Sequence, residues 1–161
     1  LIDGSDQEIA IELSASKIRF TIGAVTLTSK LIDGTFPDYP RVIPKGNDKL
    51  LQVDKKEFEH AVDRVSTVSS ERGRAVKLAL AGGKLTLSVN NPDSGSATEE
   101  LEAEYEADPL DIGFNSRYLL DIVSQIEGET AVLKLADPAS PTLIEDKDGK
   151  NALYVLMPMR V

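Results

Sequence analysis

The chain has 161 residues, 41% of them hydrophobic and 28% charged, which suits one folded domain with part of another. Its net charge of −9 counts against a protein that holds nucleic acid by phosphate contacts alone, because such contacts need concentrated Lys and Arg. It has no run of about 18 apolar residues, so no membrane partner is predicted, and it has no cysteine for disulfides or thiolate metal sites.

Three segments with alternating apolar residues open the chain: EIAIEL, KIRFTI and VTLTSKL, at 8–13, 17–22 and 25–31. A period of two predicts half-buried strands, and three strands do not close a core alone. Because the chain begins at Leu1 within this pattern, we expect a fragment or processed chain, with the start of this domain lying outside it.

A segment rich in proline and glycine follows at 33–48, with prolines at 37, 40 and 44. Proline fixes φ and lacks a donor, so an extended connector is predicted here. The expected organisation is therefore the C-terminal part of one domain with its linker at 1–45, and a complete second domain at 46–161.

The second domain contains an internal repeat. Asp54 opens DKKEFEHAVDRVSTV with Glu57 placed as in a capping box, and Asn115 opens NSRYLLDIVSQIEG with Gly128 as the predicted C-terminal stop. The apolar positions of the two helices match one for one: Phe58, Ala61, Val62 and Val65 correspond to Leu119, Ile122, Val123 and Ile126.

Three alternating segments follow each predicted helix. The first set is AVKLALA, KLTLSV and TEELEAEYE, with a Gly82-Gly83 hairpin turn, and the second is TAVLKLA, PTLIED and ALYVLMP. Residues 49–161 thus form two strand-helix-three-strand units. We predict an α+β domain in which both helices pack on one face of a curved antiparallel sheet.

The sequence offers little for catalysis. His60 is the only histidine and falls on the polar side of the first helix. DKDGKN at 146–151 has its glycine two places early for a calcium loop and favours a hairpin turn. We predict no catalytic residue, cofactor or metal; an enzyme using Asp146 and Asp148 is kept as an alternative.

The acidic segment EELEAEYE has two interpretations. Leu101, Ala103 and Tyr105 alternate with glutamates, so the two sets face opposite ways. An exposed edge strand could carry these charges to prevent edge-to-edge aggregation. The sharper interpretation, which the residues alone favour less, is a docking edge for a basic partner.

The ending YVLMPMRV also has two interpretations. Val155, Met157 and Met159 could form the core face of the last strand. Alternatively, Pro158 ends that strand and leaves Met159 accessible. Methionine is flexible and suits surfaces that accept several partners.

The segments TSKLIDGTFPDYPRVIP, IGFNSRYLLDIV and YVLMPMRV resemble the bacterial DNA polymerase III beta subunit, the sliding clamp, in order and spacing. The resemblance covers the whole chain. It implies the DNA-clamp fold, with the last strands of a middle domain and a C-terminal domain. It also implies a non-catalytic, cytoplasmic subunit that forms a head-to-tail homodimeric ring around duplex DNA, independently of DNA sequence, and makes synthesis processive.

The resemblance further implies a hydrophobic pocket that binds short linear peptides from the polymerase III alpha subunit, the clamp loader, other polymerases and repair proteins. Such a pocket would bury a leucine and an aromatic side chain of the peptide. The family's pocket residues correspond here to Pro37, Arg41, Val42, Ala139, Pro141, Val155, Met157, Pro158 and Met159.

Two further surfaces follow from the resemblance. Its subunit interface corresponds to Thr67, Val68, Glu99, Glu100, Glu102 and Glu104. Positive helix residues that would face DNA are Lys55, Lys56, Arg64 and Arg117, although ordinary surface charge explains them equally well. Without the rest of the ring, we expect this chain to be monomeric. A peptide-binding module unrelated to replication is the alternative function.

Overall fold

The computed structural model describes residues 6–36, 38–69, 74–149 and 152–161. The chain divides into two compact units, Leu1–Asp38 and Tyr39–Val161. The division falls before Tyr39, so residues 39–45, assigned to the linker from the sequence, group with the second unit. None of the helices within these described ranges is long and apolar enough to cross a membrane.

The first unit is a three-stranded antiparallel meander. Its strands are β1 (Ala10–Leu13), β2 (Lys17–Ile22) and β3 (Val25–Lys30), in the order β1-β2-β3. The strands form where they were predicted, but β1 and β3 are not half-buried: all their residues are exposed, with Ile11 and Leu13 at 59% and 70%. A sheet this small has no second layer of its own on which to bury them.

The second unit has two copies of the predicted strand-helix-three-strand unit. The first copy comprises β4 (Lys49–Asp54), α1 (Lys55–Ser66), β5 (Ala75–Ala81), β6 (Lys84–Asn91) and β7 (Gly95–Glu102). The second comprises β8 (Leu110–Asn115), α2 (Ser116–Val123), β9 (Thr130–Leu135), β10 (Thr142–Asp146) and β11 (Leu153–Leu156). A short 3-10 helix, η1 (Tyr39–Arg41), precedes them.

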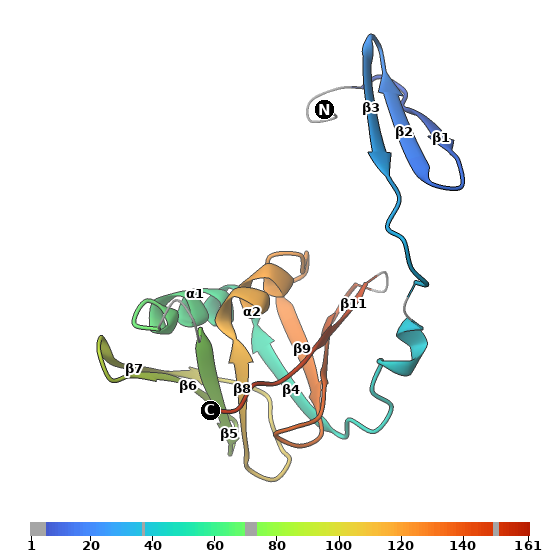
Figure 1. Ribbon diagram of the computed structural model, residues 1–161. Coiled ribbons are helices and arrows are strands. Elements are labelled where there is room, and N and C mark those ends of the chain that lie inside the picture. Colours follow the sequence, from blue (N-terminus) through green and yellow to red (C-terminus); the bar gives the residue numbers. More distant parts are fainter. Residues whose placement is uncertain (1–5, 37, 70–73, 150–151) are drawn as a thin grey trace. The chain divides into compact units, whose positions relative to one another are not determined.

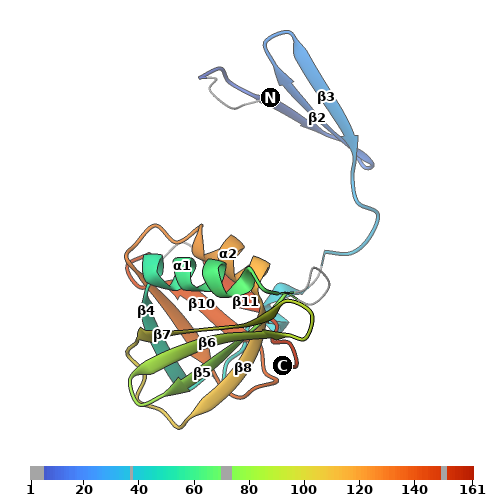
Figure 2. The same ribbon diagram turned by 90° about the vertical axis from the view of Figure 1, so that its left-hand side faces the viewer.

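The strands form two four-stranded antiparallel sheets rather than one continuous sheet, ordered β11-β10-β9-β4 and β7-β6-β5-β8. The copies exchange their first strands: β4 pairs with β9 of the second copy, and β8 pairs with β5 of the first. Both helices lie side by side over the same face of the sheets (Figures 1 and 2). Because of the exchange, neither copy completes a sheet without the other.

Two isolated β-bridges join the sheets at equivalent places, which we call the first and second seams. At the first seam, Gln52 of β4 bridges Glu104, which lies just beyond β7. At the second seam, Gly113 of β8 bridges Met159, which lies just beyond β11. In each case the chain leaves the end of one sheet and crosses to the free edge of the other.

Side-chain caps begin both helices, as predicted. The Asp54 carboxylate accepts from the Glu57 amide at 2.9 Å, and the Asn115 side-chain oxygen accepts from the Arg117 amide at 3.0 Å. Such caps satisfy backbone donors that lack a partner in the first turn. They fix the point at which each strand turns into its helix.

The second helix ends at Val123, before the predicted stop at Gly128. The Asp146 carboxylate accepts from the Gly128 amide at 2.8 Å, and the Lys55 ammonium donates to the Ile126 carbonyl at 2.6 Å. These partners come from β10 and α1, and they hold the backbone beyond Val123 in a non-helical turn. The predicted stop was therefore wrong because contacts remote in sequence end the helix.

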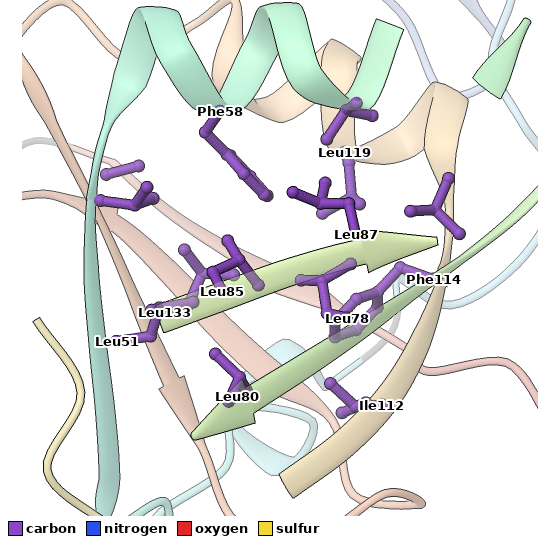
Figure 3. Packing of buried hydrophobic residues seen from close by; sticks show 14 of the residues in the cluster. Leu51, Phe58, Leu78, Leu80, Leu85, Leu87, Ile112, Phe114, Leu119 and Leu133 are labelled. Atoms are coloured by element: carbon purple, nitrogen blue, oxygen red, sulfur yellow. The ribbon is translucent and has the colours of Figure 1, made fainter. Parts of the chain in front are cut away.

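The core lies between the helices and the two sheets. Phe58 of α1 and Leu119 of α2 are fully buried, as are Leu78 of β5 and Phe114 of β8. Figure 3 shows Phe58 pointing from its helix toward β6, the strand that carries Leu85 and Leu87. Side chains from both copies fill this one core, so we infer that the copies fold together.

Candidate functional site

The last strand presents alternate residues to opposite faces of its sheet. Leu156 is buried in the core and pairs with Thr142, whereas Val155 pairs with Leu143 on the outer face, away from the helices. The alternation continues to Met157, which is 62% exposed. Val155 and Met157 therefore do not form the core face of the strand, which was one of the two interpretations of the sequence.

The outer face beside Met157 is apolar. The pairing ends at Thr142 and Leu156, and Pro141 and Met157 are the next residues beyond it, which the alternation assigns to the same outer face as Leu143 and Val155. Leu143, one row further in, is only 8% exposed despite facing outward. Pro141, Leu143, Val155 and Met157 thus form a continuous apolar strip, which we call the outer strip.

A tight turn places Ala139 and Pro141 at one end of the outer strip. The Asp137 carboxylate accepts from the Ala139 amide at 2.8 Å and from the Ser140 hydroxyl at 2.6 Å. The Ser140 hydroxyl, followed by the backbone donor of Ala139, lowers the pKa of Asp137 below its ordinary value. Asp137 therefore stays ionised at neutral pH and keeps the turn in place.

The segment before β4 is fastened to the same end of the sheet. The Asn47 side-chain amide donates to the Pro141 carbonyl at 2.9 Å and to the Lys134 carbonyl at 2.7 Å. Arg41 and Val42, at the end of η1, are exposed and belong to the same compact unit as the tail. Pro37 lies outside the described residues, and the joining of this loop to the outer strip stays a prediction.

The five residues after β11, 157–161, form the C-terminal tail. The Met159 amide donates to the Gly113 carbonyl at 2.8 Å, and Val161 lies against Gly113. Pro158 and Met159 are half-buried. The tail is thus attached to β8 at its middle, while Met157 remains open to solvent.

The predicted subunit interface gathers on one edge. Strand β7 ends its sheet, and Glu100, Glu102 and Glu104 are exposed there. Val68, beyond the end of α1, packs on the core and accepts from the Asn91 side chain through its carbonyl at 2.9 Å. The preceding residue, Thr67, is exposed. An edge strand with unpaired backbone groups is able to receive a partner strand.

Glu99 faces the other way from these glutamates and pairs with Arg64 of α1. The Arg64 guanidinium donates through both Nε, at 3.1 Å, and its terminal nitrogen. This hydrogen bonding lowers the pKa of Glu99 and raises the pKa of Arg64. Arg64 was predicted to face DNA, but the structure directs it toward the β7 edge.

The outward face of the two helices carries a mixture of charges. Lys56 and Arg117 occupy equivalent positions in the first turns, are exposed, and form no ion pair with another residue in the described ranges. Lys55 is half-buried and donates to Ile126. Of the four predicted DNA-facing cations, Lys56 and Arg117 are therefore the best placed to meet a ligand over the helices.

The residues considered for catalysis have structural surroundings. His60 is exposed on α1, and the described ranges hold no cluster of three or more metal-ligating side chains. The Asp146 carboxylate accepts from the backbone amides of Glu127, Gly128 and Asp148, which lowers the pKa of Asp146. Part of the predicted 146–151 turn, residues 150 and 151, lies outside the described residues.

Sequence reasoning missed three residues of this site: Leu143, Gly113 and Val161. Leu143 carries no sequence signal, since its outward direction depends on register with β11. Gly113 carries one, because an isolated glycine inside an apolar strand pattern indicates a bulge or a close backbone approach.

Comparisons with known proteins agree with the sequence resemblance. The family model for the C-terminal domain of the DNA polymerase III beta subunit matches residues 40–160, and that for its central domain matches residues 1–38. A beta sliding clamp of Caulobacter vibrioides is 50% identical over 161 residues, which is 100% of this chain and 43% of the relative. One from Pseudomonas aeruginosa is 42% identical over 100% of this chain and 44% of its own length.

Solved structures show the same fold. A DnaN sliding clamp from Bartonella birtlesii, crystallised with griselimycin, has a TM-score of 0.89 and 59% identity, covering 95% of this chain and 41% of that one. The DNA polymerase III subunit beta of Pseudomonas aeruginosa has a TM-score of 0.92 and 42% identity, covering 100% and 44%. These matches confirm the expected fold class, and the chain spans less than half the length of these relatives.

Proposed function

Because the chain belongs to the DNA polymerase III beta subunit family, we propose that it is part of a sliding clamp. The complete protein would form a head-to-tail homodimeric ring around duplex DNA and make replication processive. It would act in the cytoplasm as a non-catalytic subunit of the polymerase III holoenzyme. The observation that carries the specific role of this chain is the apolar outer strip, in which Met157 is exposed.

The outer strip and the tail would capture short linear peptides. Pro141 and Val155 are half-buried and Met157 is exposed, so they present apolar surface to a ligand. Leu143 pairs with Val155 and extends this apolar surface on the same face. A leucine and an aromatic side chain of the peptide would be buried against this surface, while the flexible Met157 adapts to different sequences. The partners would be the polymerase III alpha subunit, the clamp loader, other polymerases and repair proteins.

The helices and the β7 edge of the same unit would contribute to DNA retention and to subunit association in the ring. Its helices would face the DNA, with Lys56 and Arg117 near the phosphates, and its sheets would face outward. A closed ring retains DNA topologically, so a chain with a net charge of −9 needs few phosphate contacts, and few contacts permit sliding. The β7 edge would meet the neighbouring subunit in a heterologous interface, which requires both ends of each subunit to close.

The present chain should be monomeric in isolation, because the chain holds only one of the two surfaces that a ring joint needs. Light scattering on the 161-residue chain should give a monomer in dilute solution. A stable dimer would contradict the assignment of the interface to two different parts of the complete protein.

The proposed peptide site is tested by titrating a labelled polymerase tail peptide against the full-length protein and two variants. Met157→Ala removes a side chain of the outer strip, whereas Leu153→Ala is a matched control at the far end of the same strand face. The affinity should fall about tenfold for Met157→Ala and stay unchanged for Leu153→Ala. Wild-type protein that does not bind the peptide would overturn the proposal.

A further inference from the structure

Glycine at position 113 is unexpected from the local backbone. Gly113 lies inside β8 between the buried residues Ile112 and Phe114. A glycine inside a strand weakens it, because it has the most backbone entropy to lose and no side chain to pack. Gly113 is not among the glycines with positive φ, so its backbone conformation would accept any residue.

Atoms of the C-terminal tail occupy the space in which a side chain at position 113 would lie. A Cβ atom placed there would lie 2.7 Å from the Met159 carbonyl oxygen and 2.8 Å from Val161 Cγ2, with Val161 Cγ1 closer still. Separations below 3.0 Å are essentially never found for real Cβ atoms. Since one of the crowded atoms belongs to the backbone, a rotamer change in the tail cannot make enough room.

The internal repeat supplies a natural comparison. Gln52 occupies the corresponding place in β4, because it forms the bridge to Glu104 at the first seam as Gly113 does to Met159 at the second. Gln52 has a full side chain and still forms two backbone hydrogen bonds with Glu104, at 2.9 and 3.0 Å. The bridge itself therefore does not require glycine; the way in which residues 159–161 lie over β8 does.

We propose that Gly113 is a positioning residue for peptide capture. Its bare backbone lets the tail lie against β8, and this contact sets where Met157 and Met159 lie relative to Pro141, Leu143 and Val155. The inference rests on the proposed function of this site. Gly113 would act only through the tail, without touching the peptide.

This role predicts a specific pattern of loss. A side chain at position 113 displaces residues 159–161 and so moves Met159, and with it Met157, away from the other residues of the outer strip. The β7 edge and the outward face of the helices belong to other elements, so subunit association and DNA retention should persist. A purely structural role would instead weaken all three properties together.

The test uses Gly113→Ala in the full-length protein, with Gly46→Ala as its matched control. A Cβ atom at Gly46 meets open space, and φ there is ordinary, so the same substitution is harmless. Fluorescence anisotropy with a labelled polymerase tail peptide should show a loss of about tenfold or more for Gly113→Ala. Gly46→Ala should bind as the wild type does, and both variants should retain ring formation and the thermal midpoint of unfolding.

A second variant, Gly113→Ala/Val161→Gly, removes the nearest colliding side chain and should recover part of the affinity. If Gly113→Ala alone fails to fold, recovery of folding and binding in this double variant supports the role, and its absence contradicts it. Unchanged peptide affinity in a folded Gly113→Ala protein would overturn the inference and leave the proposed function standing. Absence of binding by the wild type would instead overturn the proposed function.

Discussion

The two seams have the same topology but differ in how firmly they are held. At the first, Gln52 and Glu104 exchange two backbone hydrogen bonds, and the adjacent Ala103 amide donates to the Gly83 carbonyl at 2.9 Å. At the second, Met159 donates one backbone hydrogen bond to Gly113, at 2.8 Å. The first seam is built into the domain, whereas the second leaves side chains accessible.

This difference shows how a repeated unit acquires a site without a new fold. The segment after β7 continues into the next copy, so both of its ends are held. The segment after β11 forms one backbone hydrogen bond to β8, from Met159 to Gly113, and carries Met157 and Met159, the only methionines of the chain. A segment with few hydrogen bonds can adjust to a ligand at little cost to the domain, because few other interactions depend on its position.

The largest expected effect is a loss of unfolding free energy when the hydrophobic core that the two copies share is truncated. Truncating the equivalent residues Phe58→Ala and Leu119→Ala should each destabilise the domain, by about 3–5 and 2–5 kcal/mol respectively, since both are fully buried. Chemical denaturation should show a single transition in both variants because the copies exchange strands. Separate transitions for the two copies would break the premise that the seams join one cooperative unit.

A direct comparison of the seams uses proline to remove one donor from each. Glu104→Pro removes the hydrogen bond to Gln52 and should cost about 1–3 kcal/mol of unfolding free energy, because a carbonyl loses its partner. Met159→Pro removes the bond to Gly113 and should change stability by about 0.5 kcal/mol or less, while peptide affinity falls. Equal destabilisation by the two variants, measured by denaturant titration, would contradict the distinction.

Met157→Ala tests whether the accessible side chain next to the second seam binds the peptide. We expect peptide binding to weaken by about 1–2 kcal/mol, because truncation removes the most exposed apolar surface of the outer strip. Leu153→Ala, on the same face of β11, should leave binding unchanged. Calorimetric titration would contradict this placement if both variants weakened binding equally.

Charge reversal on the outward face of the helices should have a smaller effect, and it should alter DNA retention rather than peptide binding. Lys56→Glu and Arg117→Glu together should shorten retention of the ring on circular DNA and reduce the salt dependence of DNA binding by about 0.9 for each phosphate that is no longer neutralised. Lys77→Glu together with Lys84→Glu, on β5 and β6 at positions that alternate with the buried Val76, Leu78 and Leu85, makes the same change in net charge on the face opposite the helices. Unaltered loading and retention in the double variant would remove these residues from the DNA-facing surface and leave the seams unaffected.

The smallest expected effect is the contribution of Asp146 to the loss of thermal stability at low pH. The folded-state pKa of Asp146 is lowered, chiefly by the Gly128 amide, so its contribution to stability is present above its unfolded pKa of about 3.9 and is lost as pH falls through the folded value. Asp146→Asn should therefore flatten part of the decline in thermal midpoint below about pH 4. An acid profile identical to that of the wild type would show that Asp146 is not responsible.

Local patterns predicted most elements, because alternation and helical spacing reflect burial along one segment. The matched stripes beginning at Phe58 and Leu119 and the caps at Asp54 and Asn115 were all recognisable in this way. The exchange of β4 and β8 was not predictable, since strand pairing is a non-local property. The end of α2 was missed for the same reason: Asp146 and Lys55 lie far from it in sequence.

The candidate site was predictable to a similar extent. The tail was identified by Pro158 and the methionines, and its family role came from the resemblance. Physical reasoning alone left open whether Val155 faces the core or the outside, and the register with Leu143 decided it. The pairing of Arg64 with Glu99 was not predictable, because Glu99 approaches only when β7 packs beside α1, and the place of Arg64 toward DNA stays a prediction.

The most direct test of the peptide site is methyl nuclear magnetic resonance of the full-length protein labelled at methionine, with Met157 and Met159 assigned by substitution. Addition of a polymerase tail peptide should shift both signals with the same dissociation constant that anisotropy gives. If the peptide binds while both signals remain in place, it binds elsewhere, and the assignment of the outer strip and tail to partner capture is wrong.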